Sequence, residues 1–358
     1  LGGGKLLAGR DELVPLEKFA GKELTSISYV SKALMAKIGT GKKDIDDLLA
    51  LVDEMLPVAG LPEEKERQIR KDAAALAADL KRAIPEPGAM MGFTFMTDSG
   101  MEGYTYDWSE PSQLDGSKPL SLLEHVGGSP ILALVGRTKT SPEGYDLLVK
   151  WVKVAYGYFE DFVKPQLSDS ETEDFEKFIG KAIPLVKRLD KANRDLLIPA
   201  LADGQMGLVL DAKLTSKQFH EAMPPTEEPM PMAEPALIFG VSDAAALVKG
   251  LAEYREVVNG FIDLFREIEP GSLPPFEIPP PLSEKTKEGT LYYYPLPEEF
   301  GLDRKVFPNA GLSEKVAAIT ASREHTARLL ASTPLQIGGV LAGAEDRRLA
   351  MAAALDWA

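Results

Sequence analysis

The chain contains no cysteine, only three histidines and no long uninterrupted apolar run. Without cysteine it can form neither disulfides nor thiolate metal sites, and it has no cysteine nucleophile. No apolar run approaches the roughly 18 residues that a membrane-spanning helix needs, so we expect no membrane span. The lack of cysteine does not fix a compartment, because a cysteine-free chain suits an oxidising exterior as well as a cytosol.

Positive charge is scarce relative to negative charge. Lys and Arg number 40 against 55 Asp and Glu, which gives a formal net charge of −15 at pH 7. Such a chain repels a phosphate backbone, so we expect neither nucleic-acid nor anionic-membrane partners. Hydrophobic residues make up 44% of the 358 residues, which is enough to build folded domains with real cores.

One pattern occurs twice along the chain. In each copy an aspartate closes a strand, a proline-led apolar strand follows, and a long helix then carries an aromatic residue and a glycine. The landmark pairs are Asp107 and Asp211, Pro130 and Pro235, Trp151 and Tyr254, and Gly157 and Gly260. The members of each pair lie 103 to 105 residues apart. Duplicated positions are constrained first by a shared fold, so the repeat predicts architecture rather than activity.

The spacing of apolar residues predicts both helices and strands. Helices are expected over 44–56, 62–83, 142–163, from Ser168 or Ser170 onward, 243–268 and 323–330. Strands are expected over 26–30, 91–97, 102–107, 130–136, 204–210, 235–240, 316–320 and 349–357. Hairpin signals between strands of mixed length predict an α+β fold of tandem repeated units, each a largely antiparallel sheet with helices packed on it.

The repeat also suggests domain boundaries. We expect an N-terminal strand and helical segment over 1–88, a first α+β unit over 89–203 and a second over 204–348 with a Pro-rich insertion at 269–297. Residues 349–358 look like the start of a third unit, because Leu355-Asp356-Trp357 echoes Asp107-Trp108. We expect this last strand to pair within the second unit, in a chain that belongs to a longer protein.

Local details of two helices can also be predicted. Ser168 and Ser170 are each followed three residues later by glutamate, which is the spacing of a capping box. Pro184 lies inside the same helix, where we expect a kink or break. In the helix over 243–268 an apolar stripe recurs at spacings of four and three residues, and we expect it to be buried. The stripe consists of Leu247, Leu251, Tyr254, Val258, Phe261 and Phe265.

The string Gly240-Val241-Ser242-Asp243-Ala244 lies between a strand and a helix. A nucleophile elbow occupies that context, so a serine hydrolase with Ser242 as nucleophile and His220 or His325 as base is one hypothesis. The final glycine of the elbow is replaced by Ala244, however, and a helix N-cap explains Ser242 or Asp243 equally well. We therefore expect Ser242 to cap the helix, with no histidine near its hydroxyl.

Each histidine adjoins a glutamate, in the pairs Glu124-His125, His220-Glu221 and Glu324-His325. Neighbouring side chains on a helix or strand point apart, and no two histidines have the i, i+4 spacing of a helical metal site. We interpret all three as surface histidines, and we expect neither a metal nor a cofactor.

The segment Leu291-Tyr292-Tyr293-Tyr294 follows the most proline-dense part of the chain. Tyrosine offers a large contact area with a polar tip, which favours recognition of a ligand. Alternation along a strand places Tyr292 and Tyr294 on one face and Tyr293 on the other. Tyr292 and Tyr294 are therefore candidate binding residues, although packing within a core explains them as well.

The repeated strand end, the proline-led strand and the Gly240-Val241-Ser242-Asp243 opening of a long helix make this chain similar to uncharacterised exported bacterial proteins built from tandem α+β units. The resemblance spans about residues 89–358. It implies export to the periplasm or cell envelope and a non-enzymatic role, and the start at Leu1 without methionine is consistent with a processed precursor. No activity and no functional residues transfer with it.

Two functions of different class follow. The first is an exported binding or cell-envelope-associated protein that holds an apolar small molecule or a partner protein. The second is the serine hydrolase based on Ser242. Apart from the aspartate that closes a strand in each copy, the landmarks of the repeat are not polar pairs, and a catalytic site between the copies would need convergent polar pairs, so the binding function is favoured.

Overall fold

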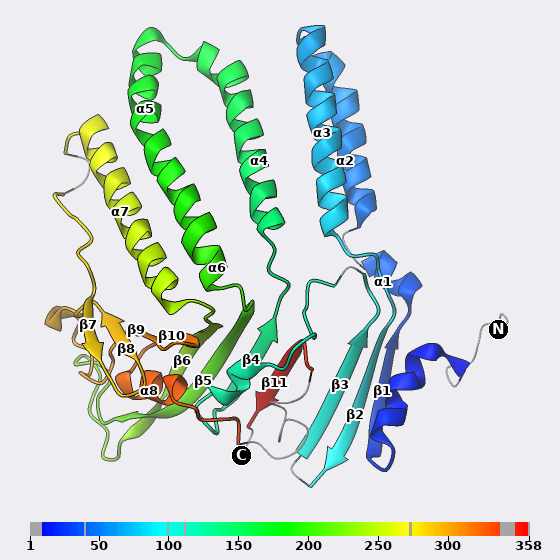
Figure 1. Cartoon of the computed structure of the whole chain (residues 1–358), viewed down its shortest axis with the longest axis vertical. Helices are drawn as coiled ribbons and strands as arrows, with labels where there is room; N and C mark the ends of the chain where they lie inside the picture. The colour runs from blue at the N-terminus through cyan, green and yellow to red at the C-terminus, as the bar shows by residue number, and fades with distance from the viewer. Residues whose placement is uncertain are drawn as a thin grey trace. The chain divides into compact units, whose positions relative to one another are not determined.

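The structure is a computed structural model that describes residues 9–38, 41–98, 100–110, 112–271, 274–336 and 348–356. The described chain forms two compact units, which divide at Gln113 and Leu114. Each unit contains one antiparallel sheet with helices beside it (Figure 1). The fold is therefore α+β with antiparallel sheets, as the sequence predicts.

The first unit is built on a three-stranded sheet of β1 (Glu23–Val30), β2 (Met90–Thr97) and β3 (Gly100–Asp107), in that order. Met91, Phe93 and Phe95 alternate along β2 and are buried beneath the 3-10 helix Asp11–Phe19. The predicted hairpin between β2 and β3 is confirmed. Helix α1 (Lys32–Ile38) precedes a helical hairpin of α2 (Lys42–Met55) and α3 (Glu63–Ala83).

The second unit is built on an eight-stranded sheet with the strand order β11-β4-β5-β6-β10-β9-β8-β7. Every neighbouring pair is antiparallel. The strands are β4 (Leu132–Arg137), β5 (Gln205–Ser216), β6 (Met230–Gly240), β7 (Leu282–Lys285), β8 (Thr290–Tyr293), β9 (Asn309–Leu312), β10 (Val316–Thr320) and β11 (Met351–Leu355).

Long helices project from one end of this sheet (Figure 1). They are α4 (Pro142–Tyr158), α5 (Asp169–Ala192) and α7 (Ala244–Ile268). The short α6 (Ile198–Ala200) lies between α5 and β5 in the chain. Asn193, in a π turn after α5, donates a hydrogen bond to Tyr145 Oη of α4 at 3.1 Å and accepts one from Tyr254 of α7. The capping box at Ser168 and Glu171 is confirmed. Pro184 does not break α5, which continues through it.

The main core lies on one face of the larger sheet. Alternate residues of five strands point to this face and are buried, and Val135, Val209 and Ile238 have no exposed surface. Helix α8 (Arg323–Leu330) and the 3-10 turn Ser121–Glu124 cover it. The predicted strand over 316–320 and the predicted helix over 323–330 are both confirmed.

The structure does not confirm the tandem repeat. Asp107 ends β3 in the first unit, whereas Asp211 lies inside β5 in the second unit, beside an irregularity in strand pairing. Gly260 packs closely on Leu185, whereas a Cβ at Gly157 would meet nothing within 4 Å. The division at residue 113 also falls inside the segment 89–203, and the larger sheet runs across the expected boundary at residue 203.

The prediction that the α7 stripe is buried is wrong. Leu251 is 57% exposed and Phe265 is 51% exposed, whereas Val257 and Leu264 are buried. The cause is that α7 projects beyond the sheet, where α5 and the segment 274–278 pack on parts of its surface. Apolar residues surround much of this helix, so their spacing alone does not identify the side that packs.

The predicted strand over 349–357 is present as β11, and Trp357 lies outside the described residues. It pairs with β4, from Met351 opposite Gly136 to Leu355 opposite Leu132. The strand therefore pairs within its own chain, although β4 belongs to the segment that was expected to form the first unit.

Candidate functional site

Ser242 holds a backbone turn in place rather than facing a catalytic base. Its Oγ accepts a hydrogen bond from the Asp203 N–H at 2.9 Å. The cap of α7 is Asp243 rather than Ser242, because the Asp243 carboxylate accepts a hydrogen bond from the Ala246 N–H at 2.9 Å. Among the described residues, no hydrogen bond joins a histidine to Ser242.

The turn at Asp203 is part of a larger clamp at the end of the sheet. Arg137, which is 4% exposed, donates to the carbonyl oxygens of Lys118 at 2.8 Å, Pro119 at 2.9 Å and Asp203 at 3.2 Å. Buried guanidinium groups need such partners, and here they are three backbone oxygens and the Asp203 carboxylate at 3.3 Å. Ser242 therefore contributes to a structural clamp that fixes the ends of β4 and β5.

The interpretation of all three histidines as surface residues is wrong. His125 and His325 are buried, and His220 is half-buried. His125 Nδ1 lies 3.0 Å from the Leu329 carbonyl oxygen, and His220 Nδ1 accepts a hydrogen bond from the Ala222 N–H at 3.0 Å. The three residues occupy separate places. Among the described residues, no three His, Asp or Glu side chains are grouped so as to hold a metal.

A buried polar cluster, not predicted from the sequence, joins α8 to β5 and β6. Glu234 has no exposed surface, and it accepts hydrogen bonds from Ser322 Oγ at 2.6 Å, from the Leu214 N–H at 2.9 Å and from Arg328 at 2.9 Å. Arg328 also lies 3.3 Å from the Asp211 carboxylate. Burial raises the pKa of Glu234, but these hydrogen bonds and the Arg328 charge outweigh it, so its pKa lies below the usual value.

His325 lies in this cluster with no exposed surface. Neither ring nitrogen has a hydrogen-bond partner among the described residues. Burial lowers the pKa of His325 to about 4, and only part of that effect is reversed by the negative charge of Glu234. The ring is therefore neutral at pH 7. The charge inside the strand at Ala233-Glu234-Pro235 is the sequence signal that indicates such a cluster.

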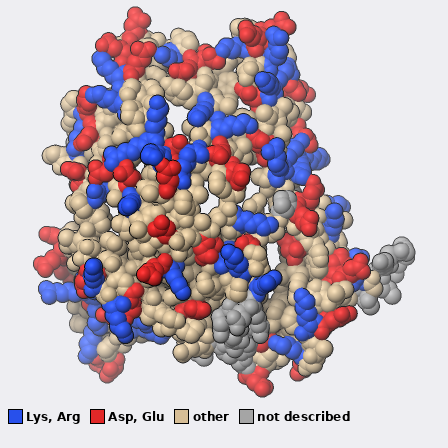
Figure 2. Space-filling view, viewed as in Figure 1, with Lys and Arg blue, Asp and Glu red and all other residues tan. Residues whose placement is uncertain are grey.

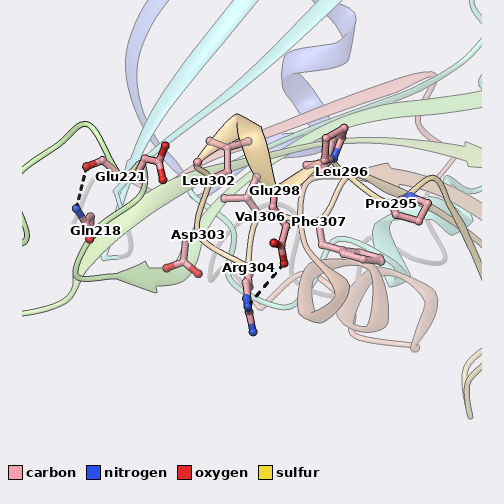
Figure 3. Close-up of a pocket in the computed structure, with 12 residues that line it drawn as sticks. Gln218, Glu221, Pro295, Leu296, Glu298, Leu302, Asp303, Arg304, Val306 and Phe307 are labelled. Atoms are coloured by element: carbon pink, nitrogen blue, oxygen red, sulfur yellow. Dashed lines mark hydrogen bonds and ion pairs between the residues drawn. The ribbon is translucent and has the colours of Figure 1, made fainter.

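The described part of the second unit includes two hollows that are lined partly by charged side chains. The larger, about 500 Å³, lies between the loop after β5 and residues 295–307 (Figure 3). The Asp303 carboxylate there accepts hydrogen bonds from the Lys305 N–H and from Ser216, which lower its pKa, and Arg304 pairs with Glu298 at 3.9 Å. These groups are occupied by partners within the chain, so the hollow offers no clear polar recognition.

The candidate tyrosines Tyr292 and Tyr294 have different environments. Tyr292 lines the second hollow, about 450 Å³, beside the first turn of α7. Tyr294 is exposed, and its hydroxyl donates to the Pro279 carbonyl oxygen at 3.0 Å. Tyr293 packs on Phe307 with ring centroids 4.7 Å apart. Tyr292 pairs with Ala310 and Tyr293 with the buried Asn309, so these two tyrosines alternate along β8, which ends before Tyr294.

An unusual surface of the second unit is the other face of the eight-stranded sheet, which we call the open face. Residues that pair directly across antiparallel strands share a face, so the register defines its rows. The open face consists of Ala353, Leu134, Leu208, Leu237 and Ile319 in a central row, Met351, Gly136, Met206, Phe239 and Ala317 in a second, and Leu355, Leu132, Leu210 and Pro235 in a third.

The open face is apolar and exposed. None of these residues is charged, and Leu134, Leu208, Leu237 and Ile319 are between 37% and 52% exposed. The first turn of α7 covers only the corner near Ala317. Five strands and three rows span roughly 20 Å by 15 Å, or roughly 300 Å² in projection, a size at which apolar patches are often functional.

On the side of the molecule that Figure 2 shows, charged side chains of both signs are mixed and do not gather in one place as the apolar side chains of the open face do. Figure 2 shows basic and acidic side chains interspersed over the visible side of the molecule, without a large area of a single sign. Nucleic-acid binding needs a continuous basic surface, which this side does not offer. None of the helices in the described ranges combines the length and the apolar content needed to cross a membrane.

Comparison with known proteins found no similar protein. No family model matches the sequence, and neither the curated proteins nor the solved structures contain a match. The resemblance to exported bacterial proteins of tandem α+β units therefore stays a prediction, and function has to be inferred from the surface itself.

Proposed function

We propose that this protein is a non-enzymatic binding protein whose open face holds an amphipathic helix of a partner protein. The observation that carries the proposal is the set of three uncharged rows across β11, β4, β5, β6 and β10. Exposed apolar surface is costly in water, at about 25 cal/mol per Å². A partner that covers the open face would recover that free energy.

The flatness of the open face favours a protein over a small molecule. Small apolar ligands usually lose most of their surface in an enclosed pocket, whereas a sheet face contacts a ligand from one side only. A helix of about 14 residues is about 21 Å long, which matches the width of the five strands. The net charge of −15 favours basic residues on the solvent side of that helix.

A direct test uses a fluorescent 14-residue peptide with leucines on one helical face and lysines on the other. We expect saturable binding, measured by fluorescence anisotropy, and at least about 10-fold weaker binding to a Leu237→Lys variant, since a buried leucine contributes about 1.5–3 kcal/mol. The matched control is Leu148→Lys, because Leu148 is exposed on α4, away from the open face.

A second peptide of the same composition, with its leucines scattered around the helix, separates shape from charge. Equal binding of both peptides would indicate simple attraction of basic peptides to an acidic protein. Equal binding to the Leu237→Lys and Leu148→Lys variants would move the site away from the open face. Either result would refute the proposal.

The serine hydrolase is the alternative, and the geometry gives it little support, because Ser242 accepts a backbone hydrogen bond and His220 and His325 have other surroundings. A fluorophosphonate probe tests it. Labelling of the protein that disappears in Ser242→Ala would favour the hydrolase over the binding function.

Export to the periplasm or cell envelope is proposed on the sequence alone. Fractionation of cells that express the full precursor tests this proposal, and recovery of the mature chain only from the cytosol would contradict it.

A further inference from the structure

The two edges of the eight-stranded sheet are protected to different degrees. At one edge, β7 carries Glu284 and Lys285, follows the run Pro279-Pro280-Pro281, and is tied to α8 by a 2.5 Å ion pair between Glu284 and Arg323. Charges and prolines are the usual devices that prevent an edge from pairing with another chain. The β11 edge, Met-Ala-Ala-Ala-Leu, has neither.

The outer backbone groups of β11 form a regular row that no strand of the described ranges pairs with. The Arg137 N–H donates to the Ala350 carbonyl oxygen at 2.9 Å, and the Asp356 N–H donates to the Ile131 carbonyl oxygen at 2.8 Å. In an antiparallel ladder such bonds recur at every second residue. The N–H and C=O groups of Met351, Ala353 and Leu355 therefore point away from β4, to the outer side of β11, where no described strand pairs with them.

We propose that β11 pairs with β11 of a second copy of this chain, antiparallel and about a two-fold axis at Ala353. In this register Ala353 lies opposite its symmetry mate, and Met351 lies opposite Leu355 of the other copy. The strand is nearly symmetric about its centre, so both copies offer the same apolar surface to each other. Six backbone hydrogen bonds form, and each copy donates three of them.

Self-pairing fits this edge better than capture of an unrelated strand. On the core side of the sheet, Ala352 meets Ala354 of the other copy, and alanine leaves room for two twisted sheets to approach. No charged residue within β11 is brought opposite a like charge. The pairing also joins the two open faces into one surface, which adds to the proposed binding function but does not depend on it.

The dimer is expected to be weak. A five-residue strand is about 17 Å long, and the contact it makes is smaller than the roughly 800 Å² per partner of a standard interface. Association should therefore depend on concentration between about 10 µM and about 1 mM. Sedimentation velocity over this range measures it directly, because the 38.8 kDa chain and its dimer separate well.

Three variants identify the edge. Ala353→Pro removes an outward N–H that the pairing with β4 does not use, and it should leave the chain monomeric at every concentration. Ala353→Lys and Ala353→Glu should each be monomeric because like charges then meet on the axis, whereas an equal mixture of the two should associate again. Leu237→Lys, in the middle of the open face, should dimerise like the wild type.

The outcomes distinguish an edge dimer from a monomer and from a dimer that forms through the open faces. A wild-type chain that stays monomeric up to about 1 mM, or an Ala353→Pro variant that associates like the wild type, would overturn the proposal. Loss of association in Leu237→Lys with retention in Ala353→Pro would indicate a dimer through the open faces instead. Circular dichroism of each variant confirms that it is folded before sedimentation is measured.

Discussion

Replacement of His325 should remove a specific loss of stability in mild acid. The folded protein holds this histidine with a pKa of about 4, against 6.5 for an ordinary histidine. Between these values the unfolded chain binds a proton that the folded chain does not bind, so stability falls as the pH decreases. From about pH 7.5 to about pH 5, the linkage equation gives a loss of about 2 kcal/mol from this residue alone.

The variant His325→Phe keeps a ring in the same place and has nothing to protonate, so it should not show this loss. At neutral pH it should be at least as stable as the wild type, because two unpaired buried nitrogens disappear. The half-buried His220 provides the control, and His220→Phe should lose stability like the wild type.

Urea unfolding measures these differences. Because the chain has two compact units, one transition does not describe both of them. In a Trp108→Phe, Trp357→Phe background the remaining tryptophan is Trp151 of α4, so its fluorescence reports the unit that contains His325. If His325→Phe loses as much stability as the wild type between the two pH values, then His325 is not buried in its neutral form and the reasoning fails.

Four further predictions concern the same unit and the same urea assay. Glu234→Gln should cost about 3 kcal/mol, since it weakens the pairing of the half-buried Arg328 with a fully buried partner; a loss no larger than that of an exposed charge change would show that the cluster is solvated. Ser242→Ala should cost about 1 kcal/mol through the lost hydrogen bond to Asp203. Gly260→Ala should destabilise by about 1–3 kcal/mol, because its Cβ would lie 2.6 Å from Leu185. Gly157→Ala, with open space around it, should instead stabilise α4 by about 0.5–1 kcal/mol.

The sequence predicts local elements well where the chain itself encodes their ends. The capping box at Ser168 needs only a serine, a glutamate and their spacing, and the hairpin between β2 and β3 needs only residues that tolerate a tight turn. Pro184 is the exception, because α5 accommodates the proline inside a continuous helix. These features depend on a few neighbouring residues, so a single sequence reveals them.

Features that depend on distant contacts were not predictable in the same way. The cluster of Glu234, Ser322 and Arg328 joins segments about 90 residues apart, and no spacing rule connects them. The repeat is a further case, since Asp107 and Asp211 occupy similar places in the sequence but lie in different sheets. A regular interval in sequence does not by itself show that two segments have the same partners.

The open face shows most clearly why the candidate site escaped prediction. Strands β4, β5 and β6 are apolar on both faces, a pattern that is typical of strands covered on both sides. The structure covers only one side, and the side chains there are small at Ala133, Ala236 and Ala318, whereas leucines occupy the exposed central row.

This distribution of side-chain size bears on function. Burial of large apolar side chains stabilises a fold more than burial of alanine, so a sheet selected for stability alone would place its leucines in the core. Here the small residues allow α8 and the turn at Ser121–Glu124 to pack closely on the inner face, and the larger residues remain available on the outer face. The larger apolar side chains of this sheet therefore lie on its exposed face, and this distribution is the physical basis for proposing a binding function.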